Sequence, residues 1–172
     1  MIELTPVDKD EWMPRVRVQV IQTEAEARKI DDQLTNDGIL ADVPSMHIVA
    51  ERVPAEWPEG YIVRLAWEPF PIIGWVHAQL RSTNPRTAEL SWEIAQRYRG
   101  HGYMREAIPR VTAWLIRRRA IQVIDANIYV GDEASQKVAL AAGLDQTEVF
   151  NPGRRLQRWE RRLESSVPPN SG

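Results

Sequence analysis

The chain has 172 residues, with 22 Lys or Arg against 24 Asp or Glu, so its formal net charge is -2. This length suits one domain with a single core, and the balanced charge gives no global reason to expect a nucleic-acid or anionic-membrane partner. Because the chain has no cysteine, disulfides, thiolate zinc sites and a cysteine nucleophile are excluded together.

The N-terminal sequence MIELTPVDKDEW has acidic residues where a secretory signal would have a basic start and an apolar run. No window of the sequence approaches the roughly 18 consecutive apolar residues of a membrane-spanning helix. We therefore expect a cytoplasmic protein with no membrane partner.

The segment that follows a short expected strand at residues 2–5 carries contradictory signals. Trp12, Val16 and Val20 recur at helical spacing, whereas RVRVQV (15–20) alternates like a strand. We prefer the helical interpretation here.

A second helix is expected over residues 24–35, because Thr23 and Glu26 have capping-box spacing and NDG provides a stop. Residues 39–60 contain three prolines and are expected to form a surface loop.

Three strand-like segments then follow in close succession and predict an antiparallel meander. They are YIVRLAW (61–67), IIGWVHAQL (72–80) and AELSWEIA (88–95). Residues 102–119 place apolar side chains on one helical face and predict a helix.

QVIDANIYV (122–130) is expected to be a strand, and residues 133–142 a short helix stopped by Gly143. Since a helix joins 88–95 to 122–130, these two strands should lie parallel through a crossover. TEVF (147–150) and RLQRWERRL (155–163) are expected closing strands, and 164–172 a disordered tail.

The stretch RYRGHGYMREAIPR sets two glycines between an expected strand and an expected helix. Gly100 and Gly102 permit positive φ and close approach of a ligand, and the backbone N–H groups of the helix start attract an anion. Arg97, Arg99 and His101 add positive charge around this turn. The pattern therefore predicts a phosphate site.

Several phosphate-binding motifs are compatible with such a turn. A P-loop is excluded because its Lys and hydroxyl residue are missing. A dinucleotide fingerprint would need a small residue where Arg105 stands, although Asp125 lies about twenty residues further on, so a dinucleotide-binding protein stays open. A turn that merely joins strand to helix also stays open.

The R-x-x-G-x-G pattern of Arg97, Gly100 and Gly102 resembles that of the GNAT superfamily of acetyl-CoA-dependent N-acetyltransferases. The run AELSWEIAQRYRGHGYMREAI is similar to the RimJ/RimL-type branch, which acetylates protein N-terminal amines. The family's N-x-x-S element is represented by Asp132 to Ser135, with Asp in place of the usual Asn.

This resemblance implies an α/β (α+β) fold with a mixed, largely antiparallel central sheet flanked by helices, and a V-shaped splay between two central parallel strands. The clear resemblance covers about residues 88–145, strand order extends it to 61–163, and we expect one domain over residues 1–163. The resemblance also implies acetyl-CoA as co-substrate, no metal, and an amine acceptor that is a peptide N-terminus or a small molecule. Many relatives are homodimers, although no feature of this sequence indicates one.

The resemblance places the pyrophosphate on backbone amides near 98–103 and the pantetheine arm at the end of the strand before them. The cofactor-binding residues so implied are Ile94, Ala95, Arg97, Tyr98, Arg99, Gly100, His101, Gly102, Tyr103 and Asp132. The oxyanion donor would be a backbone N–H near Ile94 or Ala95.

For the general base, Glu89 and Glu93 lie on one face of their strand, and either could instead be a solvated position or an ion-pair partner. For the acid, many relatives use a Tyr where this chain has Leu140, so Ser135 is the better candidate. The alternative function is a catalytically weak acyl-CoA-binding sensor. The three histidines share no ligand spacing, so no metal site is expected.

Overall fold

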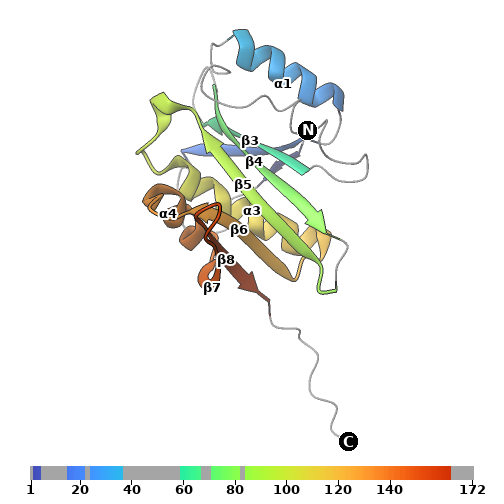
Figure 1. The fold of residues 1–172 in the computed structure, drawn as a ribbon. Coiled ribbons are helices and arrows are strands. Elements are labelled where there is room, and N and C mark those ends of the chain that lie inside the picture. Colours follow the sequence, from blue (N-terminus) through green and yellow to red (C-terminus); the bar gives the residue numbers. More distant parts are fainter. Residues whose placement is uncertain are drawn as a thin grey trace, which may run out of the picture.

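The computed structural model describes residues 2–4, 15–21, 24–36, 59–66, 71–81 and 84–163. Within them, eight strands form one sheet in the order β1-β2-β3-β4-β5-β6-β8-β7 (Figure 1). The strands are β1 (Ile2–Leu4), β2 (Val16–Ile21), β3 (Glu59–Leu65), β4 (Ile72–Arg81), β5 (Thr87–Ile94), β6 (Val123–Tyr129), β7 (Asp145–Asn151) and β8 (Leu156–Arg162). The helices are α1 (Glu24–Asn36), α3 (Tyr103–Arg119) and α4 (Glu133–Ala141), with a 3-10 turn η1 at Gln96–Tyr98.

The prediction of a helix through Val16 and Val20 is wrong, because Val16–Ile21 is strand β2. β2 pairs antiparallel with β1 on one side and with β3 on the other. Val16, Val18 and Val20 are each at most 1% exposed. The alternating pattern of the sequence therefore identifies the buried face of this strand, and the helical spacing does not. Trp12 lies outside the described residues.

Most other elements agree with the expectations. The helix expected at 24–35, the three-strand meander, the long helix α3 and the two closing strands are all confirmed. Of the expected loop at 39–60, residues 39–58 lie outside the described residues, and Glu59 and Gly60 begin β3. The tail 164–172 also lies outside them. No helix in the described part of the chain is long and apolar enough to cross a membrane.

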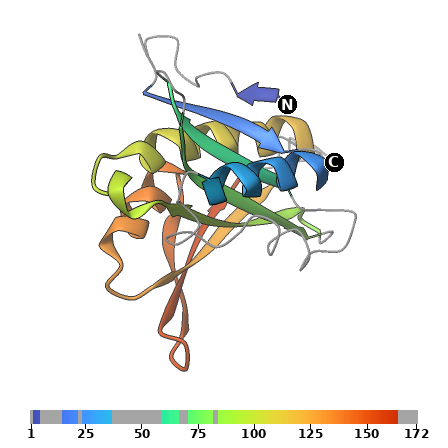
Figure 2. The ribbon, with the colours of Figure 1, turned by 90° about the horizontal axis from the view of Figure 1, so that it is seen from above.

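The sheet separates two apolar layers. In the larger core, Ile108 and Leu115 of α3 are fully buried and pack against alternate residues of the strands. On the other face, Ile30 of α1 packs with Ile21 and Ile62. Figures 1 and 2 show α1 and α3 on their separate sides of the sheet.

The two central strands, β5 and β6, lie parallel and are joined through α3, which confirms the predicted crossover. They pair only at Thr87 with Val123, Ala88 with Ile124, and Glu89 with Asp125. Beyond Glu89, β5 continues beside β4 to its end, whereas β6 stays beside β8 along its whole length. The strands therefore splay apart, and the predicted V-shaped gap is confirmed.

Candidate active site

The glycine turn, residues 99–102, connects η1 to the start of α3. Gly100 and Gly102 have φ of 79° and 81°, in the left-handed region that glycine adopts without penalty. Gly102 is the N-cap of α3 and makes no side-chain capping hydrogen bond. The amides of the first helical turn lack intrahelical acceptors, so this turn can receive an anion.

The side chains predicted to surround the turn do gather there, but they do not all face outward. Arg99 points back along the chain, donating from Nε to the Ile94 carbonyl at 3.0 Å and pairing through Nη2 with Glu93 Oε1 at 2.8 Å. His101 stacks on Tyr103 with ring centroids 5.5 Å apart. Arg99 therefore ties the turn to the end of β5.

Arg97 lies over the ring of Tyr98, with 5.1 Å between its Cζ and the ring centroid. Arg97 is exposed and Tyr98 is half-buried, so the guanidinium stacks on the outer face of η1. This position leaves Arg97 at the surface beside the turn.

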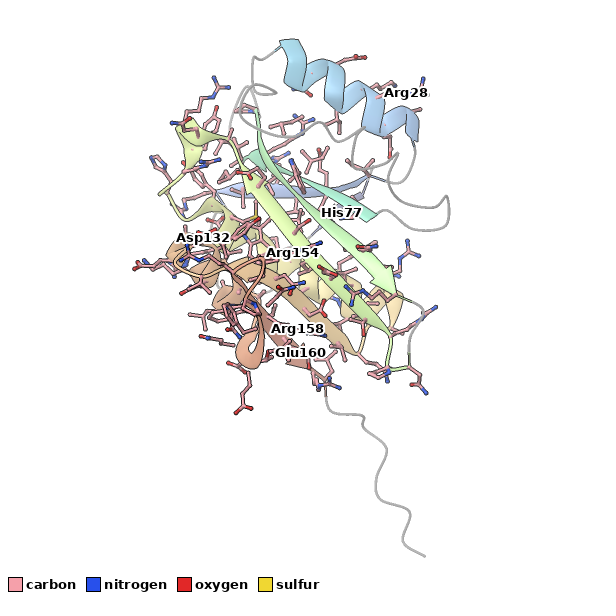
Figure 3. The ribbon with its side chains drawn as sticks, viewed as in Figure 1. Arg28, His77, Asp132, Arg154, Arg158 and Glu160 are labelled. Atoms are coloured by element: carbon pink, nitrogen blue, oxygen red, sulfur yellow. The ribbon has the colours of Figure 1, made fainter. Side chains whose placement is uncertain are left out.

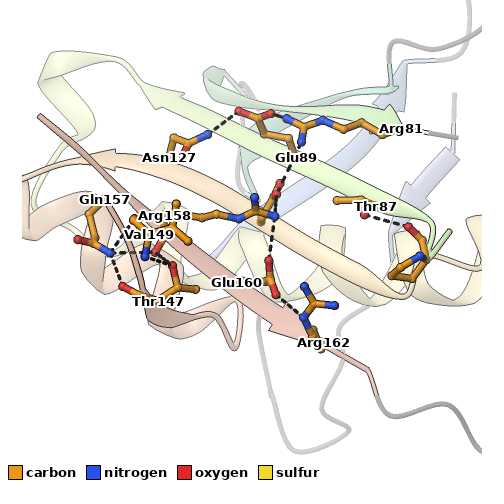
Figure 4. Close-up of polar contacts among 12 residues, drawn as sticks. Arg81, Thr87, Glu89, Asn127, Thr147, Val149, Gln157, Arg158, Glu160 and Arg162 are labelled. Carbon is orange, nitrogen blue, oxygen red and sulfur yellow. Dashed lines mark hydrogen bonds and ion pairs between the residues drawn. The ribbon is translucent and has the colours of Figure 1, made fainter. Parts of the chain in front are cut away.

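Glu89 lies at the closed end of the gap, in the last residue pair that joins β5 to β6. Its two carboxylate oxygens are both engaged: Asn127 Nδ2 donates to Oε1 at 3.0 Å, and Arg81 Nη2 pairs with Oε2 (Figure 4). The carboxylate is therefore held from both neighbouring strands, β4 and β6. Neither partner was predicted from the sequence.

Asp125, the register partner of Glu89 on β6, extends this polar network. Its side chain is 2% exposed, and Oδ2 lies 2.5 Å from Arg158 Nη2 and 4.0 Å from Arg81 Nη1. Burial raises the pKa of Asp125, while the charges of Arg158 and Arg81 oppose that shift and Glu160 adds to it. Arg158 also pairs with Glu160 at 2.8 Å (Figures 3 and 4).

One signal in the sequence could have located Asp125 and Asn127. In VIDANIY they alternate with the buried residues Ile124, Ala126 and Ile128, which places both polar side chains on the same face of β6. That face is also the face of Glu89, because Glu89 and Asp125 are register partners. The register itself could not be read from the sequence.

The backbone at the end of β5 distinguishes the two predicted oxyanion donors. Ala95 N donates to Ile73 O of β4 at 2.9 Å, so this amide is already occupied. Since neighbouring amides of a strand point to opposite sides, the amide of Ile94 faces the gap, where Glu93 Oε1 accepts from it at 3.2 Å. Of the two amides, that of Ile94 is the one oriented into the gap.

Glycine at position 74 allows β4 to approach β5 closely at this point. A Cβ on Gly74 would lie 2.4 Å from the carbonyl oxygen of Glu93. The close backbone contact positions Glu93 and Ile94 at the open part of the gap.

Asp132 and Ser135 lie in the first turn of α4. Asp132, labelled in Figure 3, is the N-cap, and its Oδ1 accepts from Ser135 N at 3.0 Å. Asp132 therefore performs the capping role that Asn would also perform. Leu140, where many relatives have Tyr, is 58% exposed.

His77 is a buried polar residue of β4 whose Cα pairs with that of Ser91 on β5. In the described part of the chain its Nε2 has no hydrogen-bond partner, and burial lowers the pKa of the imidazole. Burial therefore disfavours the charged form of His77, which lies on the same face of the sheet as the two candidate bases. From the sequence, His77 was considered only as a metal ligand.

A family model described as an acetyltransferase (GNAT) domain matches residues 6–145 of the chain. Ribosomal-protein-S5-alanine acetyltransferase from Vibrio fischeri is similar in structure, with a TM-score of 0.66 and 16% identity over 98% of this chain and 100% of that chain. The GNAT-family acetyltransferase from Bacillus anthracis has a TM-score of 0.63 and 14% identity, covering 94% of this chain and 98% of that chain.

Spermidine N-acetyltransferase from Vibrio cholerae, solved with CoA and spermine, has a TM-score of 0.61 and 17% identity over 86% of this chain and 95% of that chain. A comparison with curated proteins found no match. At these identities the structural similarities establish a shared fold.

Proposed function

The chain belongs to the GNAT family of acetyltransferases, enzymes that transfer acetyl groups to amines, and from this premise we propose that its acetyl donor is acetyl-CoA and that transfer is direct. The acceptor is a protein N-terminal amine or a small-molecule amine. The expected similarity to the RimJ/RimL-type branch agrees with the fold shared with a ribosomal-protein acetyltransferase. The observation that carries the proposal is the gap between β5 and β6, closed at Glu89 and leading to the glycine turn at its open end.

The residues present fit coenzyme A. Gly100 leaves room just before the start of α3, because a Cβ at this position would meet no atom within 4 Å. The amides of this turn would hold the pyrophosphate, with Arg97, His101 and Tyr103 around it. The pantetheine arm would run along the gap, where the amide of Ile94 is available once Glu93 turns away.

Bound acetyl-CoA supplies the thioester carbon that the acceptor nitrogen attacks, so that an N–C bond forms and the C–S bond breaks. We propose that Glu89 receives the proton from the amine through a chain of water molecules along the gap, because Glu89 lies five residues before Ile94 on β5. The amide of Ile94 would stabilise the developing oxyanion. The amide of Ala95 is a weaker candidate because Ile73 O occupies it.

Ser135 is the proposed acid that donates a proton to the leaving thiolate, and solvent then restores its own proton. Glu93 is the second candidate base, and its carboxylate pairs with Arg99 at 2.8 Å and accepts from the Ile94 amide at 3.2 Å. Asp132, the N-cap of α4, would lie near the bound cofactor.

The test combines binding and turnover. A thermal-shift titration with acetyl-CoA, coenzyme A, NAD and ATP should show stabilisation by both coenzyme A forms, about 5 to 10 °C at a hundred times the dissociation constant. Mass spectrometry with peptides bearing free N-termini and with spermidine then identifies the acceptor.

The outcomes separate the alternatives. Binding of coenzyme A without acetylation of any amine would favour the acyl-CoA sensor, for which the ion-paired state of both carboxylates is the supporting observation. Stabilisation by NAD alone would overturn the proposal. The cytoplasmic location and a homodimer remain predictions, to be checked by fractionation and by light scattering.

A further inference from the structure

Arg15, which immediately precedes β2, reaches the glycine turn although 86 residues separate it from His101. Its Nη1 donates to the His101 carbonyl at 3.2 Å, and its guanidinium lies over the ring of Tyr103 at 5.2 Å. Its Nη2 is 3.6 Å from the position that a Cβ on Gly102 would take. The side chain therefore lies directly at the N-terminus of α3.

Glu106, in the first turn of α3, holds Arg15 in this place. Glu106 Oε2 pairs with Arg15 Nε at 2.9 Å, and Oε1 accepts from Arg15 N at 2.6 Å and from Val16 N at 3.2 Å. The Glu106 side chain is 11% exposed, whereas that of Arg15 is 52% exposed. The anchor is thus largely buried while the guanidinium keeps one side open to solvent.

The electrostatics of this arrangement favour a bound anion. The N-terminus of a helix carries partial positive charge, so a guanidinium there is unfavourable unless negative charge offsets it. Glu106 shares its negative charge between Arg15 and the buried Arg110, whose Nη1 lies 3.9 Å from its Oε1. The half-exposed guanidinium of Arg15 therefore places positive charge beside the glycine turn.

We propose that Arg15 is a positioning residue for the phosphates of coenzyme A, an inference that rests on the proposed function. It fixes the turn through the His101 carbonyl and adds a cation beside the amides that receive the pyrophosphate. Because the guanidinium contacts Glu106 through Nε and the His101 carbonyl through Nη1, the single ammonium group of Lys cannot reproduce both contacts in this geometry.

Isothermal titration with coenzyme A tests this on wild type, Arg15→Ala, Arg15→Lys and Arg117→Ala. Loss of a charge-assisted contact should raise the dissociation constant of Arg15→Ala roughly tenfold or more, with Arg15→Lys between it and wild type. Arg117, exposed in the last turn of α3, is the matched control for charge and should match wild type.

A second readout separates phosphate binding from general loosening. S-acetylpantetheine is an acetyl donor that lacks the phosphates, and with it kcat/KM of Arg15→Ala should equal that of wild type. With acetyl-CoA, kcat/KM of Arg15→Ala should fall because KM rises. Added salt should weaken coenzyme A binding less in Arg15→Ala than in wild type. If Arg15→Ala is unstable, Arg15→Gln is measured in its place.

Equal coenzyme A affinity in wild type and Arg15→Ala would overturn the inference, as would an equal loss with both acetyl donors. If wild type itself fails to bind coenzyme A, the proposed function fails and the inference with it. If wild type and Arg117→Ala bind coenzyme A tightly and Arg15→Ala binds it weakly, both the inference and the proposed function are supported.

Discussion

Asn127 Nδ2 donates a 3.0 Å hydrogen bond to Glu89 Oε1 across the two central strands, two residues beyond the last backbone pair of Glu89 with Asp125. This contact spans the closed end of the gap, and Arg81 holds the other carboxylate oxygen from β4. A carboxylate fixed from both sides loses little rotational freedom when it meets its substrate, so the pair is suited to precise placement of a base.

Glu89→Gln should lower kcat about 10² to 10⁴-fold, because the amide cannot accept the proton of the acceptor amine. The dissociation constant of acetyl-CoA should stay within a few-fold of wild type. Glu93→Gln, on the same face of the same strand, is the matched control and should lose less turnover. Wild-type kcat in Glu89→Gln would remove Glu89 as the base.

Asn127→Ala should reduce kcat about tenfold with little change in thermal midpoint, since Asn127 is exposed and its loss frees Glu89 to rotate. Asn127→Asp keeps the size but replaces the donor with an acceptor, and should reduce kcat at least as much. Steady-state kinetics with saturating acetyl-CoA measures both. Unchanged kcat in the two variants would show that the hydrogen bond is structural.

Ser135→Ala should lower kcat while preserving coenzyme A affinity, and its backbone N–H can still donate to Asp132. Asp132→Asn should leave stability unchanged, because Asn caps a helix as well as Asp, whereas Asp132→Ala should cost about 1 kcal/mol. Urea unfolding of the three variants checks the cap. Wild-type turnover in Ser135→Ala would remove Ser135 as the acid.

Gly74→Ala should destabilise the protein by about 1 to 3 kcal/mol, since the new Cβ would lie 2.4 Å from a backbone oxygen of β5. Gly153→Ala is the matched control: its Cβ would meet its nearest atom at 3.6 Å. Urea unfolding should find that control close to wild type. Equal stabilities of the two variants would mean that β4 and β5 adjust at no cost.

The stability of the protein should fall as pH decreases below about 6.5, through His77. Its folded-state pKa is lowered by burial, so at such pH the unfolded chain binds a proton that the folded chain does not. His77→Gln should therefore lose less thermal midpoint than wild type between pH 8 and pH 5.5. A parallel decline in the two proteins would show that other groups set the pH dependence.

Local patterns in the sequence determined most of the architecture. Alternation, capping spacing and glycine stops predicted the meander, α1, α3, α4 and the closing strands, because each depends on neighbours within one element. They also predicted the glycine turn, since positive φ at Gly100 and Gly102 is a local property of the backbone. The prediction failed at Val16 to Val20, where helical spacing was preferred to alternation although the segment is strand β2.

Tertiary structure alone decided which side chains meet. The register of β5 against β6 set Glu89 beside Asp125 and within reach of Asn127, and no local pattern encodes a register between strands that a helix separates. The same holds for Arg15 and Glu106, which are 91 residues apart and meet because β2 packs beside the start of α3. Pairing between distant segments arises from burial of the whole sheet, a property that short windows of sequence do not contain.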